Sequence, residues 1–498
     1  MGGNHKMDYH KHNSAHLGAR KLEIENVKLM LPYIENIRDY IDSFRNSAKN
    51  SYMNHQHLKE LYYEKYDNFI SILGDRGLGK TSIMLTIIDE IKSRHYFCDK
   101  GEAQDQVIDL IAPLLVPDDM SDNSDILGWI IVTLENMFYR QLKVYNTTSC
   151  LLNRDSEINK HEELVMDCLH NLKRNYHHRK ESYKTIVDKT YRSDVEYIDE
   201  ATLIQQQDLE IVDSFNHLID AMINYKKYLN HSLYRYDDEP LIFFFFDDVD
   251  VTAQYCEGIF ETFLTFLSNA HIVTFISGDY DLFLQSVTLK LLEKEKIYHY
   301  GIDRIYLFGK TEKQYQAIEM IKKRAESFLK KVLPPMYRFE IRWLDNEKKS
   351  QIRYSKYEVN TNIENLWLDK PIKNLLKEVI DKLSEKGKDN DFLVYKHIDI
   401  FPYYSVFSRS VRGFINVYLY LVGQINALSN IKQGDNNQKL KFMEEFLQVL
   451  LNSKNTYRKN LKNISRYLYI KKGEKNDEYK RLRIDCEELK EIIKLKIE

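Results

Sequence analysis

One segment sets the architecture of this 498-residue chain: Phe69-Ile70-Ser71-Ile72-Leu73-Gly74-Asp75-Arg76-Gly77-Leu78-Gly79-Lys80-Thr81-Ser82. It joins a short apolar run to the pattern G-x-x-x-x-G-K-T, which is typical of a phosphate-binding loop. We predict a strand over residues 69–73, a glycine-rich turn, and a helix that begins near Lys80. Glycine lacks a Cβ atom, so the turn can take positive φ angles and its N–H groups can converge on an anion.

The side chains that follow the turn have distinct predicted roles at a nucleotide. Lys80 would reach the β- and γ-phosphates, Thr81 would hold Mg²⁺ through its hydroxyl group, and Ser82 would lie near the α-phosphate. The helix dipole adds positive potential at the same place. A surface turn before a helix is the alternative, and the apolar runs on both sides disfavour it. The turn itself contributes the rest of the candidate site: Gly74, Asp75, Arg76, Gly77, Leu78 and Gly79.

A second motif is the segment Leu241-Ile242-Phe243-Phe244-Phe245-Phe246-Asp247-Asp248-Val249-Asp250. Six successive apolar residues do not alternate between core and solvent, so they predict a strand buried on both faces of a parallel sheet. Ligands of such sheets bind at the carboxyl ends of the strands. We therefore expect Asp247 to hold Mg²⁺, directly or through water, Asp248 to orient an attacking water, and Asp250 to support them. An acidic turn after a core strand is the alternative.

A third buried strand is predicted over residues 272–279, and it too ends in polar residues. If this strand lies between the strands over 69–73 and 241–246, then Ser277 or Asp279 would face the γ-phosphate. A strand with a polar cap is an equal alternative. Residues 106–113 are expected to form another core strand, and residues 305–308 the last one.

These strands and the helical patterns between them predict an α/β fold with a three-layer P-loop core around a parallel sheet. A helical segment precedes the core, with an amphipathic helix from Leu22 to Phe44 in which Pro32 marks a start or a kink. The final sixty residues are expected to be charged helices. The predicted organisation is a flexible tail at 1–20, an N-terminal helical segment at 21–66, the core at 67–310, a helical lid at 311–430 and a C-terminal helical region at 431–498.

The core carries a helical insertion at about 145–238 that a minimal nucleotide fold does not need. An apolar stripe there indicates helix–helix packing, with a partner-binding surface as the sharper alternative. A basic run at 174–180 is read as a solvated face, with a nucleic-acid site as the alternative. The stripe consists of Ile211, Phe215, Leu218, Ile219 and Met222.

Composition sets broad limits on function. The chain is 43% hydrophobic and 30% charged, with a net charge of −3, so no global field favours nucleic acid or membrane. Any basic surface must be local, as in the run at 457–463. The sequence shows no signal peptide and no apolar stretch long enough for a membrane span. Five scattered cysteines fit a reducing compartment, so we expect a cytoplasmic protein.

The order of the motifs resembles the AAA+ and related STAND and KAP groups of P-loop ATPases. The pair Asp247-Asp248 is closer to the STAND and KAP pattern, and the segment from Arg409 to Asn416 is similar to their lid motif. The resemblance implies that Arg409 reads the γ-phosphate, with Arg412 as the alternative because Ser408 stands where the family pattern has proline. It also implies that Arg304 reaches into a neighbouring subunit's site, with a surface arginine as the alternative.

In its layout the chain most resembles the cytoplasmic ATPases with large insertions that belong to bacterial antiviral systems, for example the ATPase of the RADAR system. This resemblance implies Mg²⁺-dependent ATP hydrolysis, assembly into a homo-oligomeric ring and control of a separate effector protein. No nuclease, protease or deaminase pattern is visible, so effector chemistry would belong to a partner. Two alternatives stay open: a nucleotide-gated scaffold with little turnover, and a DNA-acting AAA+ protein.

Overall fold

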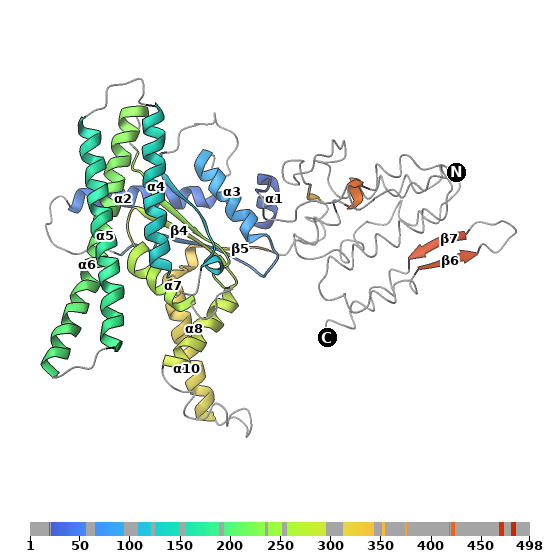
Figure 1. Cartoon of the computed structure of the whole chain (residues 1–498). Coiled ribbons are helices and arrows are strands. Elements are labelled where there is room, and N and C mark those ends of the chain that lie inside the picture. Colours follow the sequence, from blue (N-terminus) through green and yellow to red (C-terminus); the bar gives the residue numbers. More distant parts are fainter. Residues whose placement is uncertain are drawn as a thin grey trace, which may run out of the picture. The chain divides into compact units, whose positions relative to one another are not determined.

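Figure 1 shows the computed structural model of the chain, which forms two compact units. The sheet unit comprises Tyr33–Asp75 and Ile87–Glu340, and the second unit comprises Met1–Pro32, Arg76–Thr86 and Ile341–Glu498. The structure describes residues 19, 21–55, 65–93, 108–120, 125–148, 156–188, 194–234, 238–250, 256–294, 312–342, 351–353, 374–375, 418, 420–423, 468–472 and 480–484.

The described elements alternate between strands and helices along most of the chain (Figure 1). The strands are β1 (Phe69–Leu73), β2 (Leu110–Leu115), β3 (Ile242–Phe246), β4 (Ile272–Gly278), β5 (Arg338–Glu340), β6 (Leu468–Lys472) and β7 (Lys480–Ile484). The α-helices are α1 (Ile24–Met30), α2 (Asn36–His55), α3 (Lys80–Ser93), α4 (Ile126–Thr148), α5 (Ser156–Asp188), α6 (Asp194–Leu229), α7 (Cys256–Thr262), α8 (Tyr280–Lys294) and α10 (Glu312–Val332). Short 3-10 or π turns are η1 (Pro117–Asp119), η3 (Asn230–Tyr234), η4 (Phe263–Leu267) and η6 (Pro335–Tyr337).

The sheet unit is built on five parallel strands in the order β2-β3-β4-β1-β5. This confirms the predicted α/β fold with a parallel sheet. Strand β4 pairs with both β1 and β3, so it lies between them, which is the arrangement that the predicted role of Ser277 requires. Strand β2 forms an edge, where Pro113 is tolerated, and its register shifts between Ile111 and Leu114.

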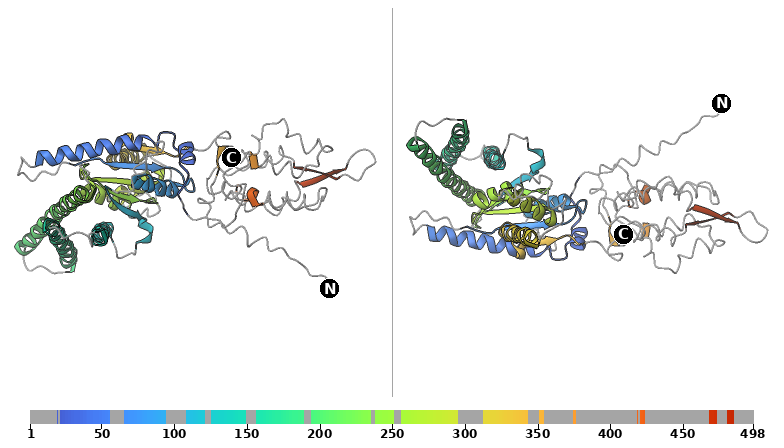
Figure 2. Two further views of the ribbon diagram at one scale, coloured as in Figure 1. Left: turned by 90° about the horizontal axis from the view of Figure 1, so that it is seen from above. Right: turned by 90° about the horizontal axis from the view of Figure 1, so that it is seen from below.

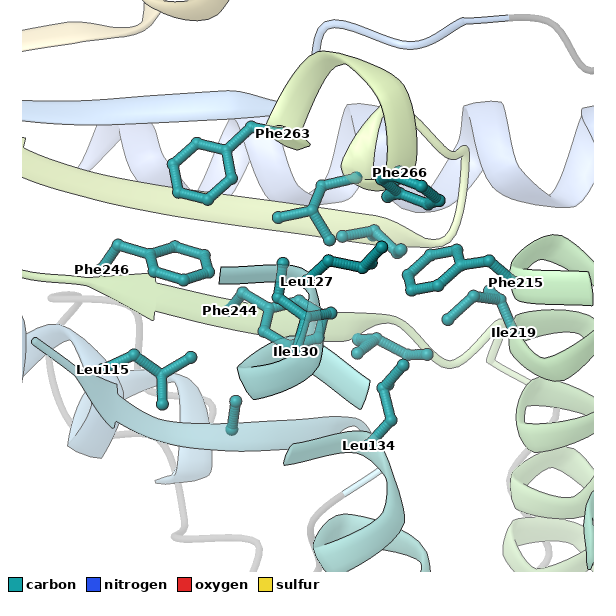
Figure 3. Close-up of a cluster of buried hydrophobic side chains, with 14 of the residues drawn as sticks. Leu115, Leu127, Ile130, Leu134, Phe215, Ile219, Phe244, Phe246, Phe263 and Phe266 are labelled. Atoms are coloured by element: carbon teal, nitrogen blue, oxygen red, sulfur yellow. The ribbon is translucent and has the colours of Figure 1, made fainter. Parts of the chain in front are cut away.

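Strand β3 is buried on both faces, as its run of phenylalanines predicts. On one face Phe245 stacks on Phe275 of β4, with ring centroids 5.0 Å apart. On the other face Phe246 packs on Phe263 of η4, with ring centroids 4.4 Å apart. Figure 3 shows Phe244 and Phe246 among side chains from α4, α6 and η4. The sheet is thus embedded in an aromatic core that holds its strands in a fixed register.

The predicted insertion forms two long neighbouring helices, α5 and α6 (Figure 1). All five residues of the predicted apolar stripe on α6 are buried. Phe215 packs on Phe266 of η4, with centroids 5.4 Å apart, which ties α6 to the core (Figure 3). The stripe therefore serves helix packing. Figure 2 shows α2 on the other side of the sheet from α5 and α6.

The basic run on α5 takes part in contacts within the unit. Arg179 forms an ion pair with Asp208 of α6 at 2.6 Å. Tyr176 and Lys180 both contact the carboxylate of Asp125, at 2.8 and 3.2 Å. Asp125 also accepts the N–H group of Gly128 and so caps the start of α4. Arg174, His177, His178 and Lys180 are exposed, as expected for the predicted solvated face.

Three segments differ from the expectation. The helix predicted over 22–44 is two helices, because the segment of Pro32 separates α1 from α2. The sheet's edge strand beside β1 is β5, which lies later in the chain than the stretch at 305–308 predicted as the last core strand; that stretch lies outside the described residues. In the C-terminal region β6 and β7 are strands rather than charged helices, and in β7 Arg481 and Arg483 alternate with Leu482 and Ile484 with the period of two that is typical of a strand.

Helix α10 begins the segment that is predicted as a helical lid, and it ends just before Pro334. Within the part of the chain that is described, no helix has both the length and the apolar character needed to cross a bilayer.

Candidate functional site

The two predicted aspartates follow β3 at its carboxyl end. Asp247 is almost completely buried, and its N–H group donates to the carbonyl of Leu115 at 2.8 Å. This bond extends the β2–β3 ladder by one residue and fixes the backbone of Asp247. A buried carboxylate at this edge is costly unless polar groups or a cation compensate its charge.

Ser277, the sixth residue of β4, connects both aspartates. Its hydroxyl group donates a short hydrogen bond to Oδ1 of Asp247. The hydroxyl oxygen of Ser277 in turn accepts a hydrogen bond from the N–H group of Asp248 at 3.2 Å. Ser277 is fully buried, so this hydroxyl group is shielded from competing water. One side chain thereby sets the carboxylate of the first aspartate and the backbone of the second.

Asp248 has a φ angle of 50°, which makes it the one non-glycine residue in the left-handed region among those described. Aspartate tolerates this region better than most residues, though at some cost. The turn lets Val249 return to β4, where its N–H group donates to the carbonyl of Ser277 at 3.3 Å. Backbone strain of this kind concentrates at functional sites, so the conformation marks Asp248 as a functional candidate.

Asp279 and Asp250 form a separate pair of contacts at the same edge. Oδ1 of Asp279 accepts the N–H groups of Asp281 and Leu282 at 2.9 and 3.4 Å, so Asp279 caps the amino end of α8. Oδ2 of Asp250 accepts the N–H group of Asp279 at 3.2 Å. Asp279 thus has a capping role in the described structure, which favours Ser277 as the residue of the two that serves the aspartates.

The glycine-rich turn starts at this edge of the sheet. The N–H group of Gly74 donates to the carbonyl of Gly278 at 3.0 Å and continues the β1–β4 ladder. After β1 the chain continues to β2, which lies at one edge of the sheet. After β4 it continues to β5, which lies at the other edge. The strand order therefore reverses between β1 and β4, and open α/β sheets bind ligands at such a point, outside the carboxyl ends of the strands.

Gly278 is needed at the end of β4 for a reason that the sequence pattern did not reveal. A Cβ atom at this position would lie 2.1 Å from the ring of Phe283, which is fully buried in the core. Any larger residue would push α8 away from the end of β4. The glycine lets the first turn of α8 pack closely beside Ser277.

The turn and the start of α3, residues 76–86, belong to the second unit. Gly77 and Gly79 have φ angles of 88° and 90°, as the motif predicts. The N–H group of Ile83 donates to the carbonyl of Gly79 at 3.0 Å, so the helix begins at Lys80, Thr81 and Ser82, as expected. A helix start of this kind is a place where anions bind in other proteins, because its first N–H groups point out of the helix.

The helix start is anchored within its own unit. The hydroxyl group of Thr86 accepts the N–H group of Leu22 at 2.9 Å and donates to the carbonyl of Ser82 at 2.8 Å. Lys80 is buried, whereas Asp75 and Arg76 are exposed. The arrangement gives the turn the left-handed glycines and the ordered helix terminus that a polyphosphate cradle requires.

Cys256 lies in the core near this edge but has no nucleophilic character. Burial, together with the negative charges of Asp250 and Glu257, raises the pKa of its thiol well above the ordinary value. The thiol therefore stays protonated and serves packing.

The three arginines assigned by resemblance, Arg304, Arg409 and Arg412, lie outside the described residues. Among the residues that are described, no group of three or more His, Cys, Asp or Glu side chains could hold a metal ion. A magnesium ion at a phosphate site does not need such a group, since one carboxylate, a hydroxyl group, phosphate oxygens and waters complete its shell. Asp247 and Thr81 are the residues predicted from the sequence to supply oxygen ligands of this kind.

No protein-family model matches the chain, and no curated protein matches its sequence.

Proposed function

We propose that the chain is a Mg²⁺-dependent ATPase of the AAA+ or STAND type. The observation that carries the proposal is the position of β4 between β1 and β3. In this order the turn after β1 starts beside Gly278, one residue from the serine that binds both aspartates. The finer architecture that we propose is a three-layer core with a helical lid over residues 311–430 and a C-terminal region beyond it.

In the proposed reaction, water attacks the γ-phosphorus of ATP, the bond to the bridging oxygen breaks, and ADP and phosphate leave. Lys80 would stabilise the charge on the transferred phosphoryl group. Thr81 and Asp247 would hold Mg²⁺, which supplies charge neutralisation when bound. Asp248 would orient the water and accept its proton, and Ser277 would hold both carboxylates in place. Arg409 or Arg412 from the lid, and Arg304 from a neighbouring subunit, would complete the charge stabilisation.

We further propose that this cycle controls assembly of a homo-oligomeric ring and the activity of a separate effector protein. A cytoplasmic role in bacterial antiviral defence fits the large insertion and the absence of effector motifs in the sequence. We propose ATP as the substrate instead of GTP because the chain resembles ATPases. In addition, the sequence has no guanine-reading N-K-x-D motif.

The direct test compares Lys80→Ala with the unmodified chain. We expect the variant to bind ATP at least about tenfold more weakly in Mg²⁺, because it loses one charge-assisted contact to phosphate. Anisotropy of a fluorescent ATP analogue measures the affinity, and competition with unlabelled ATP and GTP measures base preference. Lys92→Ala is the matched control, since Lys92 is an exposed lysine near the other end of the same helix. Equal affinities for the unmodified chain and Lys80→Ala would contradict the proposed site.

Ser277→Ala tests the geometry at the end of β4. The substitution removes the donor to Asp247 and the acceptor of the Asp248 N–H group. We expect turnover to fall roughly tenfold to a hundredfold and the Mg²⁺ concentration for half-maximal turnover to rise. Nucleotide affinity in EDTA should stay unchanged. Ser286→Ala is the control: it removes a buried hydroxyl group that donates to the carbonyl of Leu282 within α8. Identical kinetics of the two variants would remove the positioning role.

A further inference from the structure

Charge is segregated at the end of the chain. The 31 residues from Lys454 to Ile484 carry eleven Lys and Arg but only three Asp and Glu, a net charge of +8. The chain as a whole has a net charge of −3, so the remaining residues carry −11. Blocks of like charge of this size typically form interaction surfaces for polyanions. The cations are Lys454, Arg458, Lys459, Lys462, Arg466, Lys471, Lys472, Lys475, Lys480, Arg481 and Arg483.

Five of these cations lie in a two-stranded antiparallel ribbon formed by β6 and β7. Alternate residues of a strand belong to opposite faces of the ribbon. The register assigns Tyr469 opposite Arg483 and Lys471 opposite Arg481 on one face, here called the basic face. The other face holds the apolar residues Leu468, Ile470, Leu482 and Ile484 together with the pair Lys472 and Lys480.

The pairing has an energetic consequence. Lys471 opposite Arg481 and Lys472 opposite Lys480 are like-charge cross-strand pairs, and neither strand contains an acidic residue. Like charges directly opposite each other destabilise a ribbon. An isolated two-stranded ribbon is itself marginal in water. An anionic partner would neutralise these positive charges, and its binding would explain why the ribbon contains two like-charge pairs.

We propose that the basic face of the β6–β7 ribbon binds the phosphate backbone of single-stranded nucleic acid. Closely spaced cations match a polyanion with regularly repeated charges. Tyr469 shares the face with Lys471, Arg481 and Arg483, and an aromatic residue among cations supplies a platform on which a base stacks. This binding is independent of the proposed nucleotide site.

The charge pairing provides a variant that separates binding from folding. Lys471→Glu with Lys472→Glu turns both like-charge pairs into opposite-charge pairs, so the ribbon should become more stable. Binding should weaken at the same time. A loss of affinity in this variant therefore does not arise from an unfolded ribbon.

The experiment titrates the full chain into labelled DNA and RNA oligonucleotides of about 20 nucleotides, single-stranded and duplex, between about 50 and 250 mM salt. We expect binding that weakens steeply with salt. The double variant should bind at least about tenfold more weakly and with a shallower salt dependence. Tyr469→Ala should weaken single-strand binding more than duplex binding. The control Lys322→Glu with Lys323→Glu, on the exposed side of α10, should change the affinity less than about twofold.

Three outcomes would overturn the proposal. The first is no binding of any oligonucleotide at the lowest salt concentration. The second is an unchanged affinity in the Lys471→Glu, Lys472→Glu variant. The third is binding to phosphatidylserine vesicles but not to nucleic acid, which would assign the basic face to a membrane surface. Lys80→Ala should bind nucleic acid like the unmodified chain, so a failed ATP site and a failed ribbon would be told apart.

Discussion

Asp248→Asn is expected to lower ATP hydrolysis at least about a hundredfold and to leave ATP affinity within about twofold. Asparagine keeps the size of the side chain and tolerates the φ angle of 50°, so the backbone turn should survive. The substitution removes only the charge that would orient water and accept its proton. Phosphate release measures turnover, and anisotropy of a fluorescent ATP analogue measures binding on the same samples.

One further variant at this position separates the effect of the charge from that of the backbone. Asp248→Ala removes the charge and also puts a residue that disfavours the left-handed region at φ 50°, which costs about 1 kcal/mol. It should lose both turnover and thermal stability, whereas Asp248→Asn should lose turnover alone. Asp281→Asn, an exposed aspartate at the start of α8, is the control and should keep full turnover.

The same measurements decide between an enzyme and a nucleotide-gated scaffold. An enzyme loses turnover in Asp248→Asn and keeps ATP bound. A scaffold already binds ATP with negligible turnover before the substitution. Its turnover and its ATP affinity therefore hardly change in Asp248→Asn. If the unmodified chain hydrolyses ATP and Asp248→Asn does so equally fast, then the assignment of Asp248 to the attacking water is wrong.

The central strands and the phosphate-binding turn were predictable because their signals are local. The apolar run at 69–73 and the phenylalanine run of β3 match the observed strands closely, and α3 begins at the expected lysine. Buried parallel strands need continuous apolar sequence, and a glycine-rich turn needs left-handed residues, so both features appear directly in the residue types.

The edge strand β5 was not predictable, since its position depends on tertiary contacts. It has three residues and no apolar run. Its location is set by its pairing with β1 and by the contact of Phe339 with Tyr40 of α2. The ring centroids of these two residues are 6.1 Å apart. The β6–β7 ribbon was missed for a different reason: apolar and charged residues alternate only over Arg481–Ile484 of β7, and both strands lie in a strongly charged segment.

The sequence predicted which residue types gather at the carboxyl ends of the strands, but not how they contact one another. Ser277 and Asp279 were equal candidates from sequence, and only the contacts separate a residue that binds both aspartates from one that caps α8. The left-handed backbone of Asp248 has no sequence signal of its own, because an aspartate after a strand adopts many conformations.

The amino ends of the strands carry a buried charged network. Asp109, just before β2, accepts two hydrogen bonds from Arg45 of α2, at 2.8 and 2.9 Å, and one from the N–H group of Leu241 at 2.8 Å. Arg45 also donates to the carbonyl of Glu239. Although burial opposes ionisation of the Glu239 carboxyl, hydrogen bonds from His271 and Lys227 lower its pKa below the ordinary value. The network joins α2 and α6 to the starts of three strands.

Arg45→Met is expected to lower the free energy of unfolding by about 3–5 kcal/mol. The variant leaves the carboxylate of Asp109 buried without its cation, and a charge in that position has no route to water. The melting temperature should fall by roughly 10 °C, as measured by circular dichroism or calorimetry. Arg38→Met is the matched control on the same helix: its pair with Asp42 spans 3.9 Å and is more than half exposed, so the loss should stay below about 1 kcal/mol.

The double variant Arg45→Met, Asp109→Leu shows whether the loss comes from the unpaired charge. Replacing both partners by apolar residues of similar size should recover more than half of the lost stability, because the buried carboxylate is then absent. Equal melting temperatures for Arg45→Met and Arg38→Met would contradict the role of the network. The substitutions lie at the ends of the strands opposite to Asp247 and Ser277, so the stable double variant should keep the same ATP affinity. A loss of ATP affinity in that variant would mean that the amino ends of the strands also control the register at the candidate site.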